Sequence, residues 1–206
     1  MEPESLAKSP RGEPALNCST ALRFPSSGMS EIFLYQVDSA DLLITVDAAW
    51  LEFAQKNLAR DLVRENILGK PIWSFFSGYQ VEEVYGSLFR RVRLKQQPIV
   101  LPFRCDSPTE RRLMELNLSP LVEGGIHLES TMVQVERRKA VPLFDYAVRR
   151  SKEFVIVCSW CKKIRVADEW LEVEVAVERL GLFHVPTFPQ LSHGICPPCK
   201  AEALGR

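Results

Sequence analysis

The chain has 206 residues, enough for one large domain or for one medium domain with a small second one, and 46% of them are hydrophobic, so it can form a core. Its 26 basic and 26 acidic side chains balance, which argues against nucleic-acid binding through bulk charge. It has neither an apolar run of the roughly 20 residues that span a bilayer nor a secretory signal, so we expect a cytoplasmic protein without a membrane partner.

The first segment, residues 1–29, is rich in Pro, Ser and Gly and has no apolar period. This composition predicts a disordered leader. The patterned sequence opens at Met29, so Met29 could also be the true start of the protein. Cys18 lies in the leader, and we assign it no role.

Residues 30–136 show a mixed α and β pattern. The short apolar run 41–47 predicts a strand. Residues 48–58 place their apolar side chains at near-helical spacing and predict a helix. Gly and Pro interrupt residues 67–78, which predicts a loop with one short helical turn at most.

A long helix and three strands complete this pattern. Residues 81–96 place Val81, Val84, Leu88 and Val92 on one helical face, and Pro98 follows as a stop. In the next apolar segment, alternating side chains have the period of two that is typical of a half-buried strand, and Gly124-Gly125 predicts a hairpin turn. The three predicted strands cover residues 99–106, 111–122 and 124–136.

Three motifs in this order resemble those of PAS domains. LLITVDAAWLEFAQKN (42–57) resembles the entry from a strand into the first helix, with Asp47 where many members have Asn. ILGKPIWSFF (67–76) resembles the segment of short helices, and PFRCDSPTERRLMELNLSPL (102–121) resembles the paired later strands. The resemblance implies an α+β fold, in which an antiparallel sheet with flanking helices closes an apolar pocket, and a sensory or dimerising role.

The PAS resemblance leaves the pocket ligand unknown. The reactive-cysteine turn of flavin photosensors is missing, and the 81–96 helix has no His that could bind haem iron as in haem-binding members. His127 lies on the last predicted strand, where we favour a surface role over a ligand role. Aromatic side chains could line a pocket, although such spacings are more often those of a core. The pocket candidates are Trp50, Trp73, Phe76 and Tyr85.

The C-terminal part of the chain consists of a basic connector, residues 137–152, and a small module, residues 153–206. Four of the six cysteines form two C-x-x-C pairs in this module, with residues 162–195 between them. Two such turns can bring four thiolates to one tetrahedral Zn²⁺, and a segment this small needs such a staple to fold. The predicted structural zinc ligands are Cys158, Cys161, Cys196 and Cys199, with His193 as an alternate ligand.

The residues between the two pairs predict a helix with Leu171, Val175 and Leu180 as a partial apolar stripe and Gly181 as its cap. A knuckle, this intervening segment and a second pair at a helix start are the layout of a zinc-knuckle or treble-clef-like module. The motifs CSWCKKIR (158–165) and SHGICPPC (192–199) also resemble a small C-terminal module of bacterial signalling proteins. This resemblance implies a signalling context and no catalytic activity.

We therefore expect a non-enzymatic bacterial sensory protein with a protein partner in a signalling pathway, and PAS domains are commonly homodimeric. A zinc module that reads nucleic acid through its basic residues is a second hypothesis. Its basic residues would be Arg137, Arg138, Lys139, Arg149, Arg150, Lys152, Lys162, Lys163 and Arg165. A thiol oxidoreductase, with a C-x-x-C pair as the redox group, is a third. From the sequence alone, loss of a zinc ligand would unfold the module and leave the first domain folded.

Overall fold

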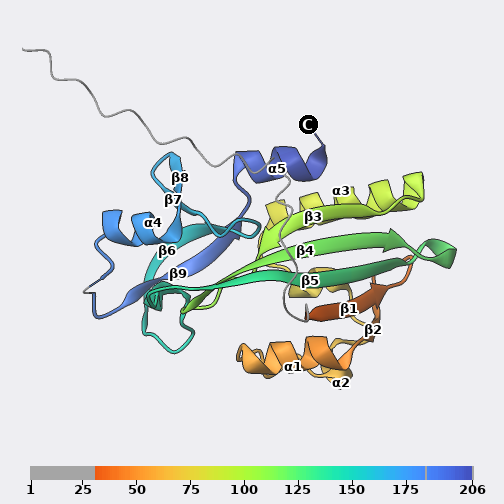
Figure 1. Cartoon of the computed structure of the whole chain (residues 1–206), viewed down its shortest axis with the longest axis horizontal. Helices are drawn as coiled ribbons and strands as arrows, with labels where there is room; N and C mark the ends of the chain where they lie inside the picture. The colour runs from red at the N-terminus through yellow and green to blue at the C-terminus, as the bar shows by residue number, and fades with distance from the viewer. Residues whose placement is uncertain (1–30, 184, 206) are drawn as a thin grey trace, which may run out of the picture.

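The computed structural model describes residues 31–183 and 185–205. The predicted leader, Cys18 and Met29 lie outside the described residues. The chain has mixed α and β structure, as predicted, but strands dominate over helices (Figure 1). No helix in the described ranges combines the length and the apolar character needed to cross a membrane.

The first half of the chain forms a five-stranded antiparallel sheet. Its strand order is β2-β1-β5-β4-β3, so the first strand lies beside the last one. The sequence predicts only the second strand before the first helix, whereas the structure places β1 between β2 and β5. The strands are β1 (Ile32–Val37), β2 (Leu43–Val46), β3 (Ile99–Arg104), β4 (Glu110–Pro120) and β5 (Ile126–Arg137).

Helices connect the second strand of this sheet to the third. Asp47 caps the first helix, because its carboxylate accepts the N–H of Trp50 at 2.7 Å and also that of Leu34 at 3.0 Å. The long helix buries Val84, Leu88 and Val92 in the core, as predicted, together with Phe89. The helices are α1 (Ala48–Lys56), α2 (Arg64–Ile67), η1 (Ile72–Phe75) and α3 (Tyr79–Lys95), and η2 (Val122–Gly124) forms the turn between β4 and β5.

The second half forms a smaller sheet with the order β8-β7-β6-β9, in which β6 and β9 run parallel. The short helix η3 (Pro142–Phe144), inside the predicted connector, buries Leu143 and Phe144 in the core beneath this sheet. The remaining elements are β6 (Arg150–Cys158), β7 (Ile164–Val166), β8 (Glu169–Leu171), α4 (Val173–Arg179), β9 (Phe188–Gly194) and α5 (Pro197–Leu204).

The helix between the cysteine pairs exists, but the predicted apolar stripe is wrong. Leu171 belongs to β8, and Val175 is 46% exposed. Helix α4 instead buries Val173, Ala176 and Val177. The helix starts at Val173, two residues after Leu171. A prediction that treats Leu171 as helical therefore assigns the wrong residues to the buried face.

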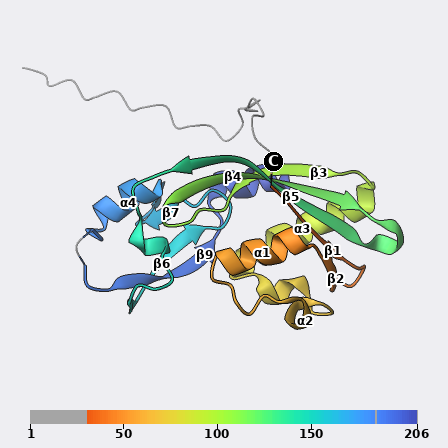
Figure 2. The ribbon, with the colours of Figure 1, turned by 60° about the horizontal axis from the view of Figure 1, so that its bottom comes forward.

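The two sheets belong to one molecule with extensive contact between its halves. The long strands β4 and β5 extend from the first sheet to the side of α4 (Figure 2). Helix α5 lies beside α3, on the same side of the first sheet (Figure 1). One hydrophobic core therefore runs from the five-stranded sheet through α3 to the cysteines at the ends of β6 and β9.

Candidate metal centre

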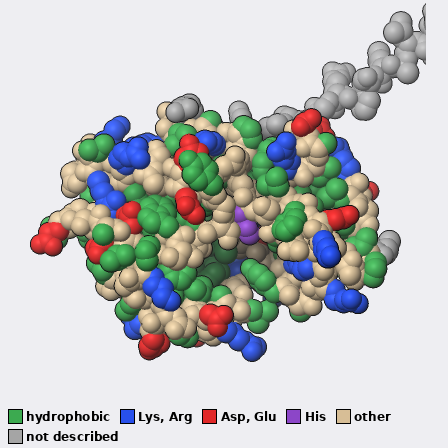
Figure 3. Space-filling view, turned by 180° about the vertical axis from the view of Figure 1, so that it is seen from behind, with side chains coloured by type: hydrophobic (Ala, Val, Ile, Leu, Met, Phe, Trp, Pro, Cys, Tyr) green, Lys and Arg blue, Asp and Glu red, His purple; other side chains and the backbone are tan. Residues whose placement is uncertain are grey.

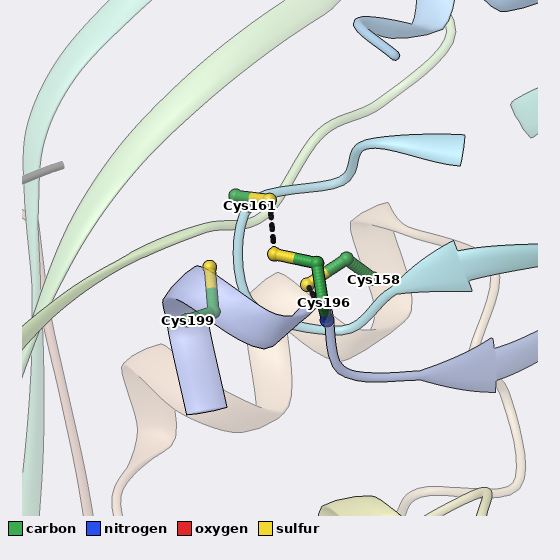
Figure 4. A group of neighbouring side chains, drawn as sticks. All are labelled: Cys158, Cys161, Cys196 and Cys199. Atoms are coloured by element: carbon green, nitrogen blue, oxygen red, sulfur yellow. Dashed lines mark hydrogen bonds between the residues drawn. The ribbon is translucent and has the colours of Figure 1, made fainter. Parts of the chain in front are cut away.

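The two C-x-x-C pairs meet because β6 and β9 run parallel as neighbours. Cys158 is the last residue of β6, and its register partner on β9 is Gly194. The turns that follow the two strands therefore lie at the same end of the small sheet. The first turn carries Cys161, and the second leads into α5, where Cys196 is the N-cap and Cys199 lies in the first turn (Figure 4).

The four sulfur atoms have the spacing of a tetrahedral metal site. All four Sγ atoms lie within 4.8 Å of one another, and those of Cys161 and Cys196 are 3.7 Å apart. Four sulfurs around one zinc at about 2.3 Å would be separated by roughly 3.8 Å along each tetrahedral edge. The same distances far exceed the roughly 2.05 Å of a disulfide, and all four thiols are free.

Burial and backbone geometry also fit a metal site. Cys158, Cys196 and Cys199 are at most 2% exposed, while Cys161 is half-buried. The backbone N–H of Cys196 donates to the Cys158 Sγ at 3.4 Å, which favours a thiolate at that sulfur. Lys162, with a positive φ of 63°, closes the first turn and donates its N–H to the Cys158 carbonyl at 3.0 Å.

The thiols strongly perturb one another. The pKa of the Cys158 thiol is lowered, because Cys161 and then Cys196 and Cys199 hydrogen-bond to its sulfur. The same neighbours raise the pKa of Cys199, with Cys158 as the largest cause. The pKa of the Cys196 thiol is lowered too, because the opposing effect of Cys158 is outweighed by hydrogen bonds from Cys161 and Cys199. The cluster thus favours thiolates at Cys158 and Cys196, while Cys161 and Cys199 keep their protons. A divalent ion would take the place of those protons and hold all four groups as thiolates.

His193, the alternate ligand, lies outside this cluster. It is an exposed residue near the end of β9, and the group of metal-ligating atoms within the described residues consists of the four cysteines. Burial of the imidazole, and then the charge of Lys162, lower the pKa of His193. The carbonyl oxygen of His193 closely approaches Gly78, at the start of α3.

The four-cysteine cluster packs directly on the first half of the chain. Trp160, between the first two cysteines, is 4% exposed, and its ring lies 5.3 Å from that of Tyr85 on α3. Its carbonyl oxygen accepts the backbone N–H of Arg104, at the end of β3, at 2.7 Å. The first knuckle is therefore in contact with both the long helix and the sheet.

Polar contacts join the second knuckle and α5 to the same helix. The N–H of Ile195 donates to the side-chain oxygen of Gln80 at 3.3 Å, and Lys200 pairs with Glu83 at 2.8 Å. Arg91 donates to the carbonyl oxygen of Ala203 at 2.8 Å, near the end of α5. These three contacts fix α5 along α3 from its first turn to its last.

Three of the four aromatic pocket candidates pack against one another. Trp73 and Phe76 have ring centroids 5.7 Å apart, and Phe76 and Tyr85 have centroids 4.5 Å apart. Trp50 lies separately, 6.2 Å from the ring of Tyr35. Burial raises the pKa of the Tyr85 hydroxyl, as expected for a side chain within a core.

Two cavities lie elsewhere and have other linings. One, of about 440 Å³, lies between α1 and the ends of β1, β4 and β5. The other, of about 490 Å³, lies where the two halves of the chain meet.

His127, which we expected to be a surface residue, lies beside Gln36 at a nitrogen–nitrogen distance of 3.2 Å.

A buried ion-pair network also joins the halves, and no sequence signal predicts it. The carboxylate of Asp106 is fully buried and lies between Arg104 and Arg138. Arg104 also pairs with Glu172 at 2.9 Å, just before α4. Arg138 pairs with Glu174 at 3.3 Å, in the first turn of that helix. Such pairs depend on how the two sheets dock, which a local pattern does not contain.

Comparison with known proteins adds no relative. The chain matches no protein-family model, and no curated protein is detectably similar to it.

Proposed function

We propose that the protein is a non-catalytic sensory protein of bacterial signalling, in which a PAS-like domain is coupled to a structural zinc centre that docks a protein partner. The observation that carries the proposal is the convergence of four thiols on one point, in a core shared with α3. A change in the first domain that moves α3 would move the knuckles with it, and this is what a signalling connection requires.

The order of the elements supports a PAS-like first half. Strands, short helices, one long helix and three antiparallel strands follow one another as the motif resemblance implies. The helices connect the second strand to the third, and α3 packs its apolar face on the sheet. The fold supplies no family assignment by itself, so the sensory role depends on this order together with the three motifs.

Zinc is the metal that the site suits best. A tetrahedral set of four thiolates selects Zn²⁺ or an iron–sulfur cluster, and sulfur atoms as close as 3.7 Å leave room for a single ion between them. Four protein ligands leave no open position for a reacting water, so the role we propose is structural. The zinc would hold the knuckles against α3 and present the outer surface of the small sheet to a partner.

Elemental analysis of the purified protein tests this proposal. We expect about one zinc per chain in the wild type and a large loss of bound zinc in Cys161→Ser, because a hydroxyl is a poor zinc ligand. Cys105→Ser is the matched control, since Cys105 is a free thiol outside the cluster. Equal zinc content in both variants, or a wild type without zinc that retains its fold, would contradict the proposal.

The nucleic-acid hypothesis receives less support from the structure. Several of its basic residues are engaged within the chain: Arg138 in the buried network, Arg150 with the carbonyl oxygens of Leu143 and Pro189, and Lys163 near Glu172. The redox hypothesis needs one C-x-x-C pair acting alone. The clustering of four thiols favours metal binding over it.

A further inference from the structure

The 490 Å³ cavity at the junction of the two halves has the size of a small-molecule site, since such sites measure roughly 300–1,000 Å³. Its walls come from the end of α1, the turn between β3 and β4, the segment after η3, and the strands β6 and β9. Ligand sites commonly lie between such units, because each contributes part of the wall. The face drawn in Figure 3 is hollowed near its middle, where hydrophobic and basic side chains and a histidine gather.

The apolar part of the cavity wall suits a planar, largely apolar molecule. Phe53 comes from α1, Phe144 and Tyr146 come from the segment around η3, and Val157 and Leu191 come from the small sheet. Aromatic rings of a ligand pack well between such side chains. Phe53 also packs on Phe33, with ring centroids 4.6 Å apart, and Arg138 lies 5.3 Å from the centre of the Phe144 ring. The rings around Trp73 and Tyr85 pack on one another and do not line this cavity.

Most charged groups of the lining have a partner within the chain. Asp106 is paired with Arg104 and Arg138, and Glu110 is paired with Arg112 at 3.0 Å. The carboxylate of Asp145 accepts the backbone N–H of Ala147 at 2.8 Å, and Lys56 lies 3.7 Å from Glu52.

Lys162 is the exception. Its ammonium donates to the carbonyl oxygen of Ser159 at 2.8 Å, and no carboxylate of the described residues forms an ion pair with it. An ammonium has three donors, so two remain for a ligand. His193 lines the same cavity and adds a ring N–H donor.

We propose that this cavity binds a small aromatic carboxylate, with its ring between Phe53 and Phe144 and its carboxylate on Lys162 and His193. The inference deepens the proposed function, on which it rests, by placing the sensed ligand at the junction. Lys162 follows Cys161 directly, and His193 is close to Gly78 at the start of α3. A ligand held by both residues would therefore contact the first knuckle directly, and it would contact strand β9, whose backbone meets the start of α3.

Titration calorimetry with a panel of acids tests the inference on the full-length, zinc-loaded protein. The probes are benzoate, 4-hydroxybenzoate, phenylacetate and indole-3-acetate, each paired with its neutral amide. We expect at least one acid to bind and its amide to bind at least about tenfold more weakly, because the amide lacks the charge that meets the ammonium. The inference is overturned if no acid of the panel binds at millimolar concentration, or if acids and amides bind equally.

Two asparagine variants locate the site. Lys162→Asn removes the ammonium, and Asn tolerates the left-handed backbone of this position (φ 63°) better than most residues. Lys163→Asn is the matched control, because Lys163 has the same charge, is the next residue and lies outside the lining. We expect the first variant to bind the acid at least about tenfold more weakly and the control to bind it as the wild type does. Equal affinity in both variants would place the ligand elsewhere and overturn the inference.

Zinc content and the unfolding midpoint, measured on the same samples, separate two kinds of failure. A wild type that holds one zinc but binds no acid refutes the ligand site and leaves the proposed sensory and docking function intact. A wild type that folds without zinc refutes the proposed function itself. A Lys162→Asn protein with wild-type zinc content and midpoint shows that lost binding reflects the missing ammonium, and Lys162→Met provides a second neutral variant if the first one is unstable.

Discussion

At the scale of single residues, Asp106 carries a negative charge that is buried inside the protein. Its side chain is fully buried, and the guanidinium groups of Arg104 and Arg138 contact it from two elements. The backbone N–H of Arg112 approaches the same carboxylate at 3.4 Å. A buried carboxylate of this kind is tolerable only because its partners are in place.

We predict that Asp106→Asn destabilises the protein by about 3–5 kcal/mol, because the substitution leaves two arginines without their buried counter-charge. Urea unfolding followed by circular dichroism measures the change. Asp168→Asn is the control, since Asp168 is 99% exposed and 3.7 Å from Arg165, and it should change stability by less than about 0.5 kcal/mol. If Asp106→Asn lowered the free energy of unfolding no more than Asp168→Asn does, the buried network would contribute little to stability.

The residues of the metal site are predictable from the sequence, whereas those of the network and the junction cavity are not. Each C-x-x-C pair is a local signal for metal binding, because one turn places two sulfur atoms close together whatever the rest of the fold is. The partners of Asp106 lie on β3 and just after β5, and its neutralisation depends on tertiary docking. In the sequence, nothing distinguishes Lys162 from the other basic residues near it, and only the fold places it in the wall of a cavity.

At the scale of elements, the sequence predicts those with a clear period. The alternation in β4 and the apolar face of α3 both appear in the structure. The sequence pattern does not predict β1, because its segment IFLYQV begins with four consecutive apolar residues and has no period of two. The predicted buried face of α4 is wrong because the helix has only about two turns. In a helix this short, the positions that face the core can be predicted only if the first helical residue is known.

Two glycines of α3 and its cap give opposite predictions for one substitution. Gly78, with φ +100°, would place an added Cβ 2.5 Å from the carbonyl oxygen of His193, whereas a Cβ at Gly86 would meet nothing within 4 Å. We expect Gly78→Ala to destabilise the protein by about 1–3 kcal/mol through strain and a forced shift of β9. We expect Gly86→Ala, in the helix interior, to stabilise it by about 0.5–1 kcal/mol.

Thermal unfolding of both glycine variants provides the measurement, with zinc content as a check that the metal site is retained. The pair controls itself, because the chemical change is identical and only the surroundings differ. If Gly78→Ala were as stable as Gly86→Ala, the close contact between the start of α3 and β9 would not exist in solution.

At the scale of the whole molecule, the four-cysteine cluster belongs to the main core and is not part of a separate module. The core that contains Leu88 of α3 continues without a break to Trp160 and Cys199. This continuity changes an expectation. From the sequence alone, loss of a zinc ligand would unfold residues 153–206 and spare the first domain, whereas a shared core predicts that both respond.

Removal of the metal from the wild type with a strong zinc chelator tests this shared response. A structural zinc contributes about 10–16 kcal/mol to small modules, which is comparable with the whole stability of a domain at about 5–15 kcal/mol. Without the ion, the four clustered thiols lose their common partner, and we expect α5 to separate from α3. We therefore expect amide hydrogen exchange to accelerate in α3 (Tyr79–Lys95) together with α5 (Pro197–Leu204), because α3 loses one of its buried faces.

Helix α1 (Ala48–Lys56) is the internal control, since it packs mainly on β1. Its exchange should change much less than that of α3. Calorimetry of the chelated protein should show the midpoint of the first domain lowered along with the loss of the module. If α3 instead keeps its protection while only residues 153–206 exchange faster, the two halves are energetically independent. A zinc centre that moves with α3 could then not transmit a signal between them.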